Sequence, residues 1–163
     1  VMKKIFIKGL IVLNLLLLLS SCKKEETVAS TTIDINQIKE EIQAKENQFA
    51  EIYNSRIMKE IGYFADDATT FPQNSQPISG KEEIIRYLKT HMDSVPLDRK
   101  VSFTTNEVFV ANDGAQVVET GYYKIVDSTN TIVNSGNYMT LFKKINGKYY
   151  SLRDMSTSDL PDN

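Results

Sequence analysis

The chain has 163 residues, of which 41% are hydrophobic and 25% are charged, values typical of one globular domain. Disordered, collagen-like and large multidomain architectures are therefore excluded. Nineteen Lys and Arg stand against twenty-one Asp and Glu, a formal net charge of −2, and this acidic balance disfavours a nucleic-acid partner.

The first 21 residues have the three-part pattern of a secretory signal. Lys3-Lys4 gives a positive start, Leu10–Leu19 forms an apolar stretch, and two small residues follow. The uncharged run is short of the roughly 20 residues that a helix needs to cross a bilayer. We therefore expect residues 1–21 to be a signal peptide rather than a permanent transmembrane helix.

The signal ends in Leu19-Ser20-Ser21-Cys22, which holds the only Cys of the chain. This segment resembles the lipobox of bacterial lipoproteins, in which the Cys is acylated and becomes the first residue of the mature chain. The resemblance implies an exported protein, anchored through lipidated Cys22 to the bacterial cell envelope, at the outer membrane. An ordinary signal peptide with an incidental thiol is the alternative.

Residues 22–33 are polar and lack helical or strand periodicity, which predicts a flexible linker after the lipidated Cys. The order Cys-x-Lys-Glu-Glu also resembles the surface-export signal of lipoproteins in Bacteroidetes-type bacteria. This segment is then either a signal that directs the protein to the cell surface or simply a solvated tether.

A long amphipathic helix is predicted over residues 34–54, because apolar residues recur there with helical spacing. Asp34 or Asn36 is expected to cap its start. The apolar positions are 35, 38, 42, 49, 52 and 53, and we expect Glu40, Glu41, Lys45 and Glu46 on the opposite, polar face.

Shorter elements are expected next. The spacing of Ile57, Met58, Ile61 and Phe64 suggests a second, short helix, and 68–71 suggests a strand before the turn at 72–77. A third helix opens at residues 79–82, with Ser79 and Glu82 as a capping box. Its expected buried face holds Ile84, Ile85, Leu88, His91 and Met92.

After Pro96 the sequence is rich in Val, Tyr, Phe, Thr and Ile, which favours strands. Asn112-Asp113-Gly114 and Asn146-Gly147 are strong hairpin turns, since these residues tolerate positive φ. Helices followed by an antiparallel meander define an α+β fold. The expected strands are 101–110, 115–126, 132–145 and 148–157.

Three segments between residues 64 and 154 resemble the nuclear transport factor 2-like superfamily, in particular its SnoaL-like and ketosteroid-isomerase-like branch. They are Phe64-Ala65-Asp66-Asp67-Ala68-Thr69, Ile78–Ile84, and Asn146–Tyr150 with Arg153-Asp154. The resemblance implies a domain over residues 34–159, followed by a tail at 160–163. It also implies a strongly curved sheet that wraps the first helix into a cone with a pocket at its open end.

Ketosteroid isomerases use an Asp base and an oxyanion hole formed by a Tyr and a protonated Asp. At the matching positions this sequence has Phe71-Pro72, Gln48 and Thr140. The isomerase reaction is therefore not expected, because a base and a strong oxyanion donor are missing at those positions. Asp66 and Asp67 are expected to be structural.

Asp154 is the best polar candidate in the expected pocket. Strand alternation, aligned with the family, places Leu152, Asp154 and Ser156 on the inner face. A carboxyl group in an apolar cavity has a raised pKa, and it can act as an acid, a base or a hydrogen-bond partner. The alternative is a carboxylate satisfied by backbone or by a neighbouring Tyr.

His91, the only His, is expected near the pocket rim, either in proton transfer or as a hydrogen-bonded boundary residue. One His and no mature thiol support no metal site, and no cofactor motif is present. The residues expected to bind a ligand are Phe71, Tyr87, His91, Tyr138, Thr140, Phe142, Leu152 and Asp154.

Three functions are compatible with the sequence. The first is a non-enzymatic lipoprotein domain that binds a small, largely apolar molecule. The second is an acid/base enzyme of isomerase, hydrolase or cyclase type, in which Asp154 works with His91 or a Tyr on a small carbonyl or ring substrate. The third is an association module that forms a homodimer through the outer face of the sheet.

Overall fold

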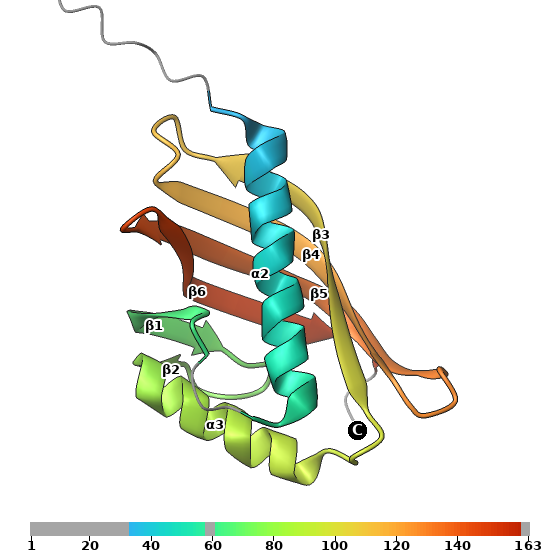
Figure 1. The fold of residues 1–163 in the computed structure, drawn as a ribbon. Helices are drawn as coiled ribbons and strands as arrows, with labels where there is room; N and C mark the ends of the chain where they lie inside the picture. The colour runs from blue at the N-terminus through green and yellow to red at the C-terminus, as the bar shows by residue number, and fades with distance from the viewer. Residues whose placement is uncertain (1–32, 58–60, 161–163) are drawn as a thin grey trace, which may run out of the picture. The chain divides into compact units, whose positions relative to one another are not determined.

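The computed structural model describes residues 33–57 and 61–160 (Figure 1). The predicted signal peptide, Cys22 and most of the linker lie outside the described residues, and these expectations stay predictions. Neither of the two helices in the described part of the chain combines the length and the apolar character needed to span a membrane.

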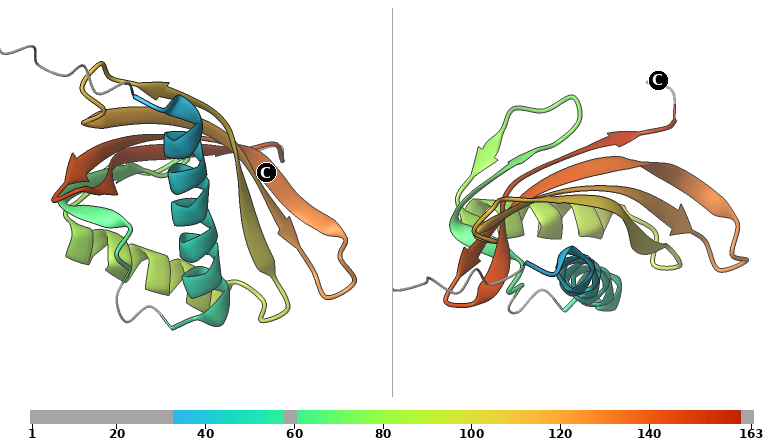
Figure 2. Two further views of the ribbon diagram at one scale, coloured as in Figure 1. Left: turned by 45° about the horizontal axis from the view of Figure 1, so that its top comes forward. Right: turned by 90° about the horizontal axis from the view of Figure 1, so that it is seen from above.

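Two helices lie on the concave side of a curved, unclosed sheet of six strands (Figure 2). The strand order is β2-β1-β6-β5-β4-β3. All neighbours are antiparallel except β1 and β6, which are parallel. The elements are α2 (Ile35–Ser55), β1 (Phe64–Phe71), β2 (Ile78–Ser79), α3 (Lys81–Ser94), β3 (Lys100–Val110), β4 (Gln116–Val126), β5 (Ile132–Ile145) and β6 (Lys148–Ser158). The predicted α+β cone is confirmed.

The long helix α2 begins and ends where short polar contacts satisfy its backbone. Oδ1 of Asp34 accepts hydrogen bonds from the backbone N–H of Asn36 and Gln37, at 3.0 and 3.1 Å, so Asp34 is the cap. At the other end Arg56 is left-handed (φ 58°). Its guanidinium donates to the carbonyls of Met92 and two later residues, which ties the end of α2 to the end of α3.

Two side chains of α2 bond to the backbone of β3, the edge strand that α2 covers. Gln43 donates to the carbonyl of Phe103 (3.2 Å) and accepts from the N–H of Thr105 (2.8 Å). Asn54 makes the same two-way contact with Val101, at 2.8 and 2.9 Å. These contacts satisfy edge groups that have no neighbouring strand, and they fix the distance between the helix and the sheet.

Two local predictions were wrong. Phe64 opens strand β1, and within the described residues no second short helix lies between α2 and β1. The start of α3 is capped by Gly80 without a side-chain hydrogen bond, and Ser79 belongs to β2, where its hydroxyl contacts that of Thr69. Strand pairing therefore replaces the predicted helix at Phe64 and the predicted cap at Ser79, while the third helix forms as expected and begins at Lys81. Met58, which was also assigned to the short helix, lies outside the described residues.

The antiparallel strands confirm the expected meander, including the turns at Gly114 (φ 67°) and Asn146-Gly147 (φ 50° and 80°). One irregularity matters for the interior. Leu141 pairs with Arg153, whereas the next residue of β5, Phe142, pairs with Ser151. Leu152 is thus the extra residue of a β-bulge, which reverses the in-and-out alternation of β6 beyond it.

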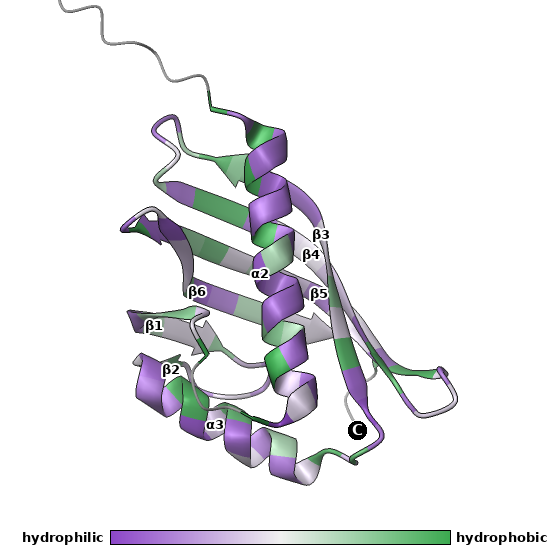
Figure 3. Ribbon diagram, in the orientation of Figure 1, coloured by the Kyte–Doolittle hydropathy of each residue, from purple (hydrophilic) through white to green (hydrophobic). Residues whose placement is uncertain are grey.

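One end of the cone is packed solid. Ile42, Val117 and Phe142 are each 0% exposed, and Tyr149 is 1% exposed while its hydroxyl donates to the carbonyl of Gly114. Figure 3 shows hydrophobic positions interspersed with hydrophilic ones along the strands and helices. This packed end supplies the hydrophobic core.

Candidate functional site

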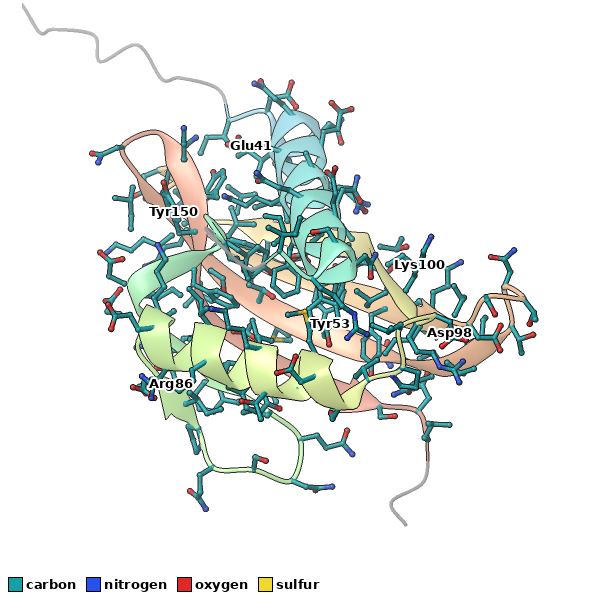
Figure 4. All side chains as sticks on the ribbon, turned by 60° about the horizontal axis from the view of Figure 1, so that its bottom comes forward. Glu41, Tyr53, Arg86, Asp98, Lys100 and Tyr150 are labelled. Atoms are coloured by element: carbon teal, nitrogen blue, oxygen red, sulfur yellow. The ribbon has the colours of Figure 1, made fainter. Side chains whose placement is uncertain are left out.

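The other end of the cone is hollow. A cavity of about 250 Å³ lies between α2, α3 and the inner face of the sheet. Most of its wall is apolar and aromatic. The aromatic side chains are Phe49, Tyr53, Tyr63, Phe64, Tyr87, Phe103, Tyr123 and Tyr138, and Tyr53 is labelled on the last turns of α2 in Figure 4.

Two neighbouring cross-strand rows of the inner face carry the polar groups at the cavity. In the first row Glu119, Thr140, Asp154 and Thr70 lie opposite one another on β4, β5, β6 and β1. The second row contains Thr105, Gly121, Tyr138 and Ser156 on β3, β4, β5 and β6. Buried carboxyl and hydroxyl groups therefore meet at the boundary between the packed end and the cavity.

Glu46 of α2 projects toward these rows and is only 1% exposed. The hydroxyl of Tyr63 donates to its Oε1, and its carboxyl group also hydrogen-bonds to Glu119. Burial, followed by the nearby Glu119 carboxylate, raises the pKa of Glu46 well above its ordinary value of 4.5. Burial therefore favours the neutral carboxylic acid form of Glu46.

Glu119 is the other member of this carboxyl pair. Its Oε1 accepts hydrogen bonds from Thr105 (2.6 Å) and Tyr138 (2.8 Å), which stabilise the ionised form. Its buried Oε2 has no hydroxyl or N–H donor among the described residues. Burial raises the pKa of Glu119 in spite of the two hydroxyl contacts, so ionisation of both members of the pair is disfavoured.

Asp154 is a second, separate acid in the cavity wall. Its Oδ2 accepts a hydrogen bond from Thr70 (2.8 Å), and its buried Oδ1 finds no donor in the described part of the chain. Burial raises the pKa of Asp154 to about 6, although the Thr70 hydroxyl opposes this effect. Asp154 is therefore ionised at neutral pH and protonated in mildly acidic solution.

Two glycines make room for the tyrosines of the inner face. A Cβ on Gly121 would lie 2.1 Å from the ring of Tyr138, and one on Gly136 would lie 2.8 Å from the ring of Tyr123. In each case the Gly is paired across the strands with that Tyr. Gly121 thus permits the close approach that brings the Tyr138 hydroxyl to Glu119.

Five of the residues predicted to bind a ligand lie in the cavity wall: Tyr87, His91, Tyr138, Thr140 and Asp154. His91 differs from its prediction in one respect, because it is exposed rather than buried on α3. It stacks on Tyr87 with ring centroids 6.3 Å apart. Ligand binding by these residues stays a prediction.

The other three residues predicted to bind a ligand do not line the cavity. Phe71 is 40% exposed at the end of β1, and Phe142 is fully buried in the packed end. Leu152 is the bulged residue of β6, so Asp154 and Ser156 reach the cavity while Leu152 does not. For these three residues the predicted place in the pocket is wrong.

The sequence analysis also missed Glu46 and Glu119. Glu46 was assigned to the polar face of the helix because it is charged, but it lies four residues after buried Ile42 and therefore on the same face. Glu119 lies two residues after buried Val117 on β4, a spacing that predicts an inward side chain. In both cases the spacing from a buried apolar residue indicates an inward side chain, whereas the charged residue type suggests an exposed one.

The three positions matched to the isomerase catalytic groups have separate environments. Gln48 is exposed on α2, Pro72 lines the cavity, and Thr140 is buried in its wall. The carboxyl groups that the cavity does hold come from other positions, namely Glu46, Asp154 and the adjoining Glu119. The described residues contain no group of three or more His, Cys, Asp or Glu arranged to hold a metal ion.

No family model matches the sequence, and no curated protein matches it. Solved structures with the same fold do match. A *Nostoc punctiforme* protein of unknown function with a cystatin-like fold has a TM-score of 0.64 at 18% identity, covering 74% of this chain and 90% of its own.

Two further structures agree with that fold. A ketosteroid isomerase-like protein from *Erwinia carotovora atroseptica* has a TM-score of 0.58 at 16% identity, with 77% and 99% of the two chains covered. A *Catenulispora acidiphila* protein in complex with S-DNPA has a TM-score of 0.63 at 15% identity, with 76% and 95% covered. The chain thus has the fold that these solved structures share, described for the Nostoc protein as cystatin-like, and this is the curved-sheet fold that the sequence resemblance implied.

Proposed function

We propose that this chain is a lipid-anchored protein of the bacterial cell envelope whose cone domain binds a small, largely apolar molecule. The observation that supports binding is the aromatic cavity of about 250 Å³ with its few buried polar groups. Ligand sites commonly combine an apolar wall with a small number of placed polar groups. Since drug-sized ligands occupy roughly 300–1,000 Å³, we expect a compact ligand.

Anchoring through Cys22 rests on the sequence of the N-terminus, where the signal pattern ends at the single Cys. Acyl chains contribute about 0.8 kcal/mol per buried methylene, and several chains on one Cys give stable attachment. Cys22→Ala should abolish incorporation of a labelled fatty acid and release the protein from the outer-membrane fraction. Retention of the label in that variant would contradict the proposal.

Binding is tested with a ligand screen by thermal shift and native mass spectrometry on the full chain. Ser156→Phe places a ring at the cavity wall and should abolish binding of any hit. Thr157→Phe is the matched control, because Thr157 is the exposed next residue on β6 and does not line the cavity. Equal loss of binding in both variants, or no hit in a broad apolar screen, would count against a cavity ligand.

A second candidate function is acid/base catalysis, favoured by the buried Asp154 carboxyl group in an aromatic cavity. Asp154 would take a proton from the carbon next to a carbonyl group, and His91 or a tyrosine of the wall would donate a hydrogen bond to the carbonyl oxygen. Deuterium exchange into small ketones, followed by NMR, measures this step. Asp154→Asn should slow catalysed exchange by about 10²–10⁴-fold; an unchanged rate would eliminate the candidate.

A homodimer is a third candidate, favoured by an apolar row on the outer face of the sheet. Phe71, Met155 and Met139 are paired across β1, β6 and β5 and are 40%, 48% and 46% exposed. Sedimentation velocity should show a dimer that Met139→Lys dissociates. A wild-type monomer at high concentration would argue against this interface.

A further inference from the structure

The charged groups that face the cavity are predominantly acidic. Glu46 and Asp154 line it, and no Lys or Arg does so among the described residues. The cationic side chains of α3 lie elsewhere: Arg86, labelled in Figure 4, pairs with Glu83 on the exposed side of that helix. His91 is the one other ionisable nitrogen at the wall, and it lies at the exposed rim.

The cavity region is negative at neutral pH. The pKa of about 6 leaves Asp154 ionised there. Glu46 and Glu119 add two further acidic groups, although burial raises the pKa of both. Tyr63 and Tyr138 stay neutral, because burial raises the pKa of both phenols. The local field therefore attracts cations and repels carboxylates.

Asp154 also has an unused acceptor. Oδ2 is held by Thr70, but the buried Oδ1 has no partner among the described residues. A buried carboxylate oxygen without a hydrogen bond is costly. Because Asp154 lines the cavity, a ligand with an N⁺–H donor would pair with its carboxylate and neutralise the charge in one contact.

The aromatic wall suits the same ligand. Phe49 packs against Tyr63, and Phe103 packs edge-on against Tyr138, with centroids 4.7 and 5.5 Å apart. The ring faces of Tyr and Phe attract cations, and more strongly when the cation is desolvated. The apolar area of these rings accommodates a hydrocarbon body.

We propose that the cavity selects a small apolar amine, bound in its protonated form with the ammonium group on Asp154. This inference rests on the proposed small-molecule binding function and specifies the ligand class. Neutral alcohols of the same shape bind more weakly, and the corresponding carboxylates are rejected.

Three probes with one common body test the selection: 3-phenylpropylamine, 3-phenylpropan-1-ol and 3-phenylpropanoate. They are titrated into the full wild-type chain by calorimetry at pH 7.5. We expect the amine to bind about tenfold or more tightly than the alcohol, as a charge-assisted hydrogen bond predicts, and the carboxylate to bind weakest. This comparison needs no variant.

Asp154→Asn should weaken amine binding about tenfold or more while changing alcohol binding by less than about threefold. Asp93→Asn is the matched control, because it removes an exposed Asp on α3 that is absent from the cavity wall. It should leave both affinities unchanged.

Two results overturn the inference and leave the proposed function standing: an alcohol that binds as tightly as the amine, or a carboxylate that binds best. Equal weakening of amine and alcohol by Asp154→Asn also overturns it. If none of the three probes binds, the amine inference is overturned as well, and the proposed function is judged by the broad screen and the Ser156→Phe variant.

Discussion

The packed end and the cavity end of the cone are built by the same elements, one step apart. In α2, one turn separates fully buried Ile42 from Glu46, and in β4 two residues separate Val117 from Glu119. On β5, Phe142 lies in the packed end and Tyr138 at the cavity. In α2 and β4 the side-chain types change across the boundary, whereas in β6 the bulge at Leu152 also changes which residues face inward.

This difference shows where the molecule gains stability and where it loses it. Apolar burial at the packed end is favourable. Burial of three carboxyl groups at the cavity end raises their pKa values, which means that the native state opposes their ionisation. Natural proteins keep such unfavourable groups mainly where function requires them.

The largest effect is expected at the packed end. Phe142→Ala removes a fully buried ring and should lower the free energy of unfolding by about 3–5 kcal/mol, measured by urea denaturation. Met139→Ala, on the outer face of the same strand, is the control and should cost well under half as much. Similar losses in both variants would show that this end is not the stabilising core.

The next effect concerns the boundary. Gly121→Ala places a Cβ against the Tyr138 ring and should destabilise by about 1–3 kcal/mol through overpacking. Gly62→Ala is a matched control, since its Cβ would meet nothing within 4 Å. Gly121→Ala should cost less in a Tyr138→Ala background than in the wild-type chain, and a purely additive double mutant would contradict this contact.

At the cavity end a substitution is expected to raise the free energy of unfolding: Asp154→Asn should stabilise the fold at pH 7.5. The folded pKa of Asp154, about 6, exceeds its ordinary value of 3.8. The stabilisation of the native state by the protonated Asp154 side chain is thus fully present below pH 3.8 and is lost as pH rises through 6. Asn cannot ionise, so we expect a gain of about 1–3 kcal/mol at pH 7.5 and little difference at pH 3.5. Destabilisation at pH 7.5 would refute a buried ionised Asp154.

The smallest effect is expected for Glu46→Gln. Because Glu46 is already neutral, an amide should change stability by less than about 1 kcal/mol at pH 5. The raised pKa makes wild-type stability fall as pH rises above 4.5, and the variant should show a shallower fall between pH 5 and 8. Glu51→Gln, an exposed change on the same helix, should leave the wild-type slope intact.

Much of this architecture could be predicted from the sequence. The long helix, the four long strands and both hairpin turns follow from apolar periodicity and turn residues. The cavity walls were predicted in part, through Tyr138 and Asp154. Glu46 was missed because periodicity was counted on apolar residues alone. The place of Leu152 depends on cross-strand register, which a single strand's alternation does not contain.

The extra residue at position 152 determines which charged side chain of β6 enters the cone. With regular alternation beyond Ser151, the guanidinium of Arg153 would point inward and Asp154 would face solvent. The same strand sequence would then offer a ligand a cation instead of a carboxylate. Among proteins of this shape, a one-residue irregularity in the last strand therefore changes the ligand contacts without any substitution at the cavity.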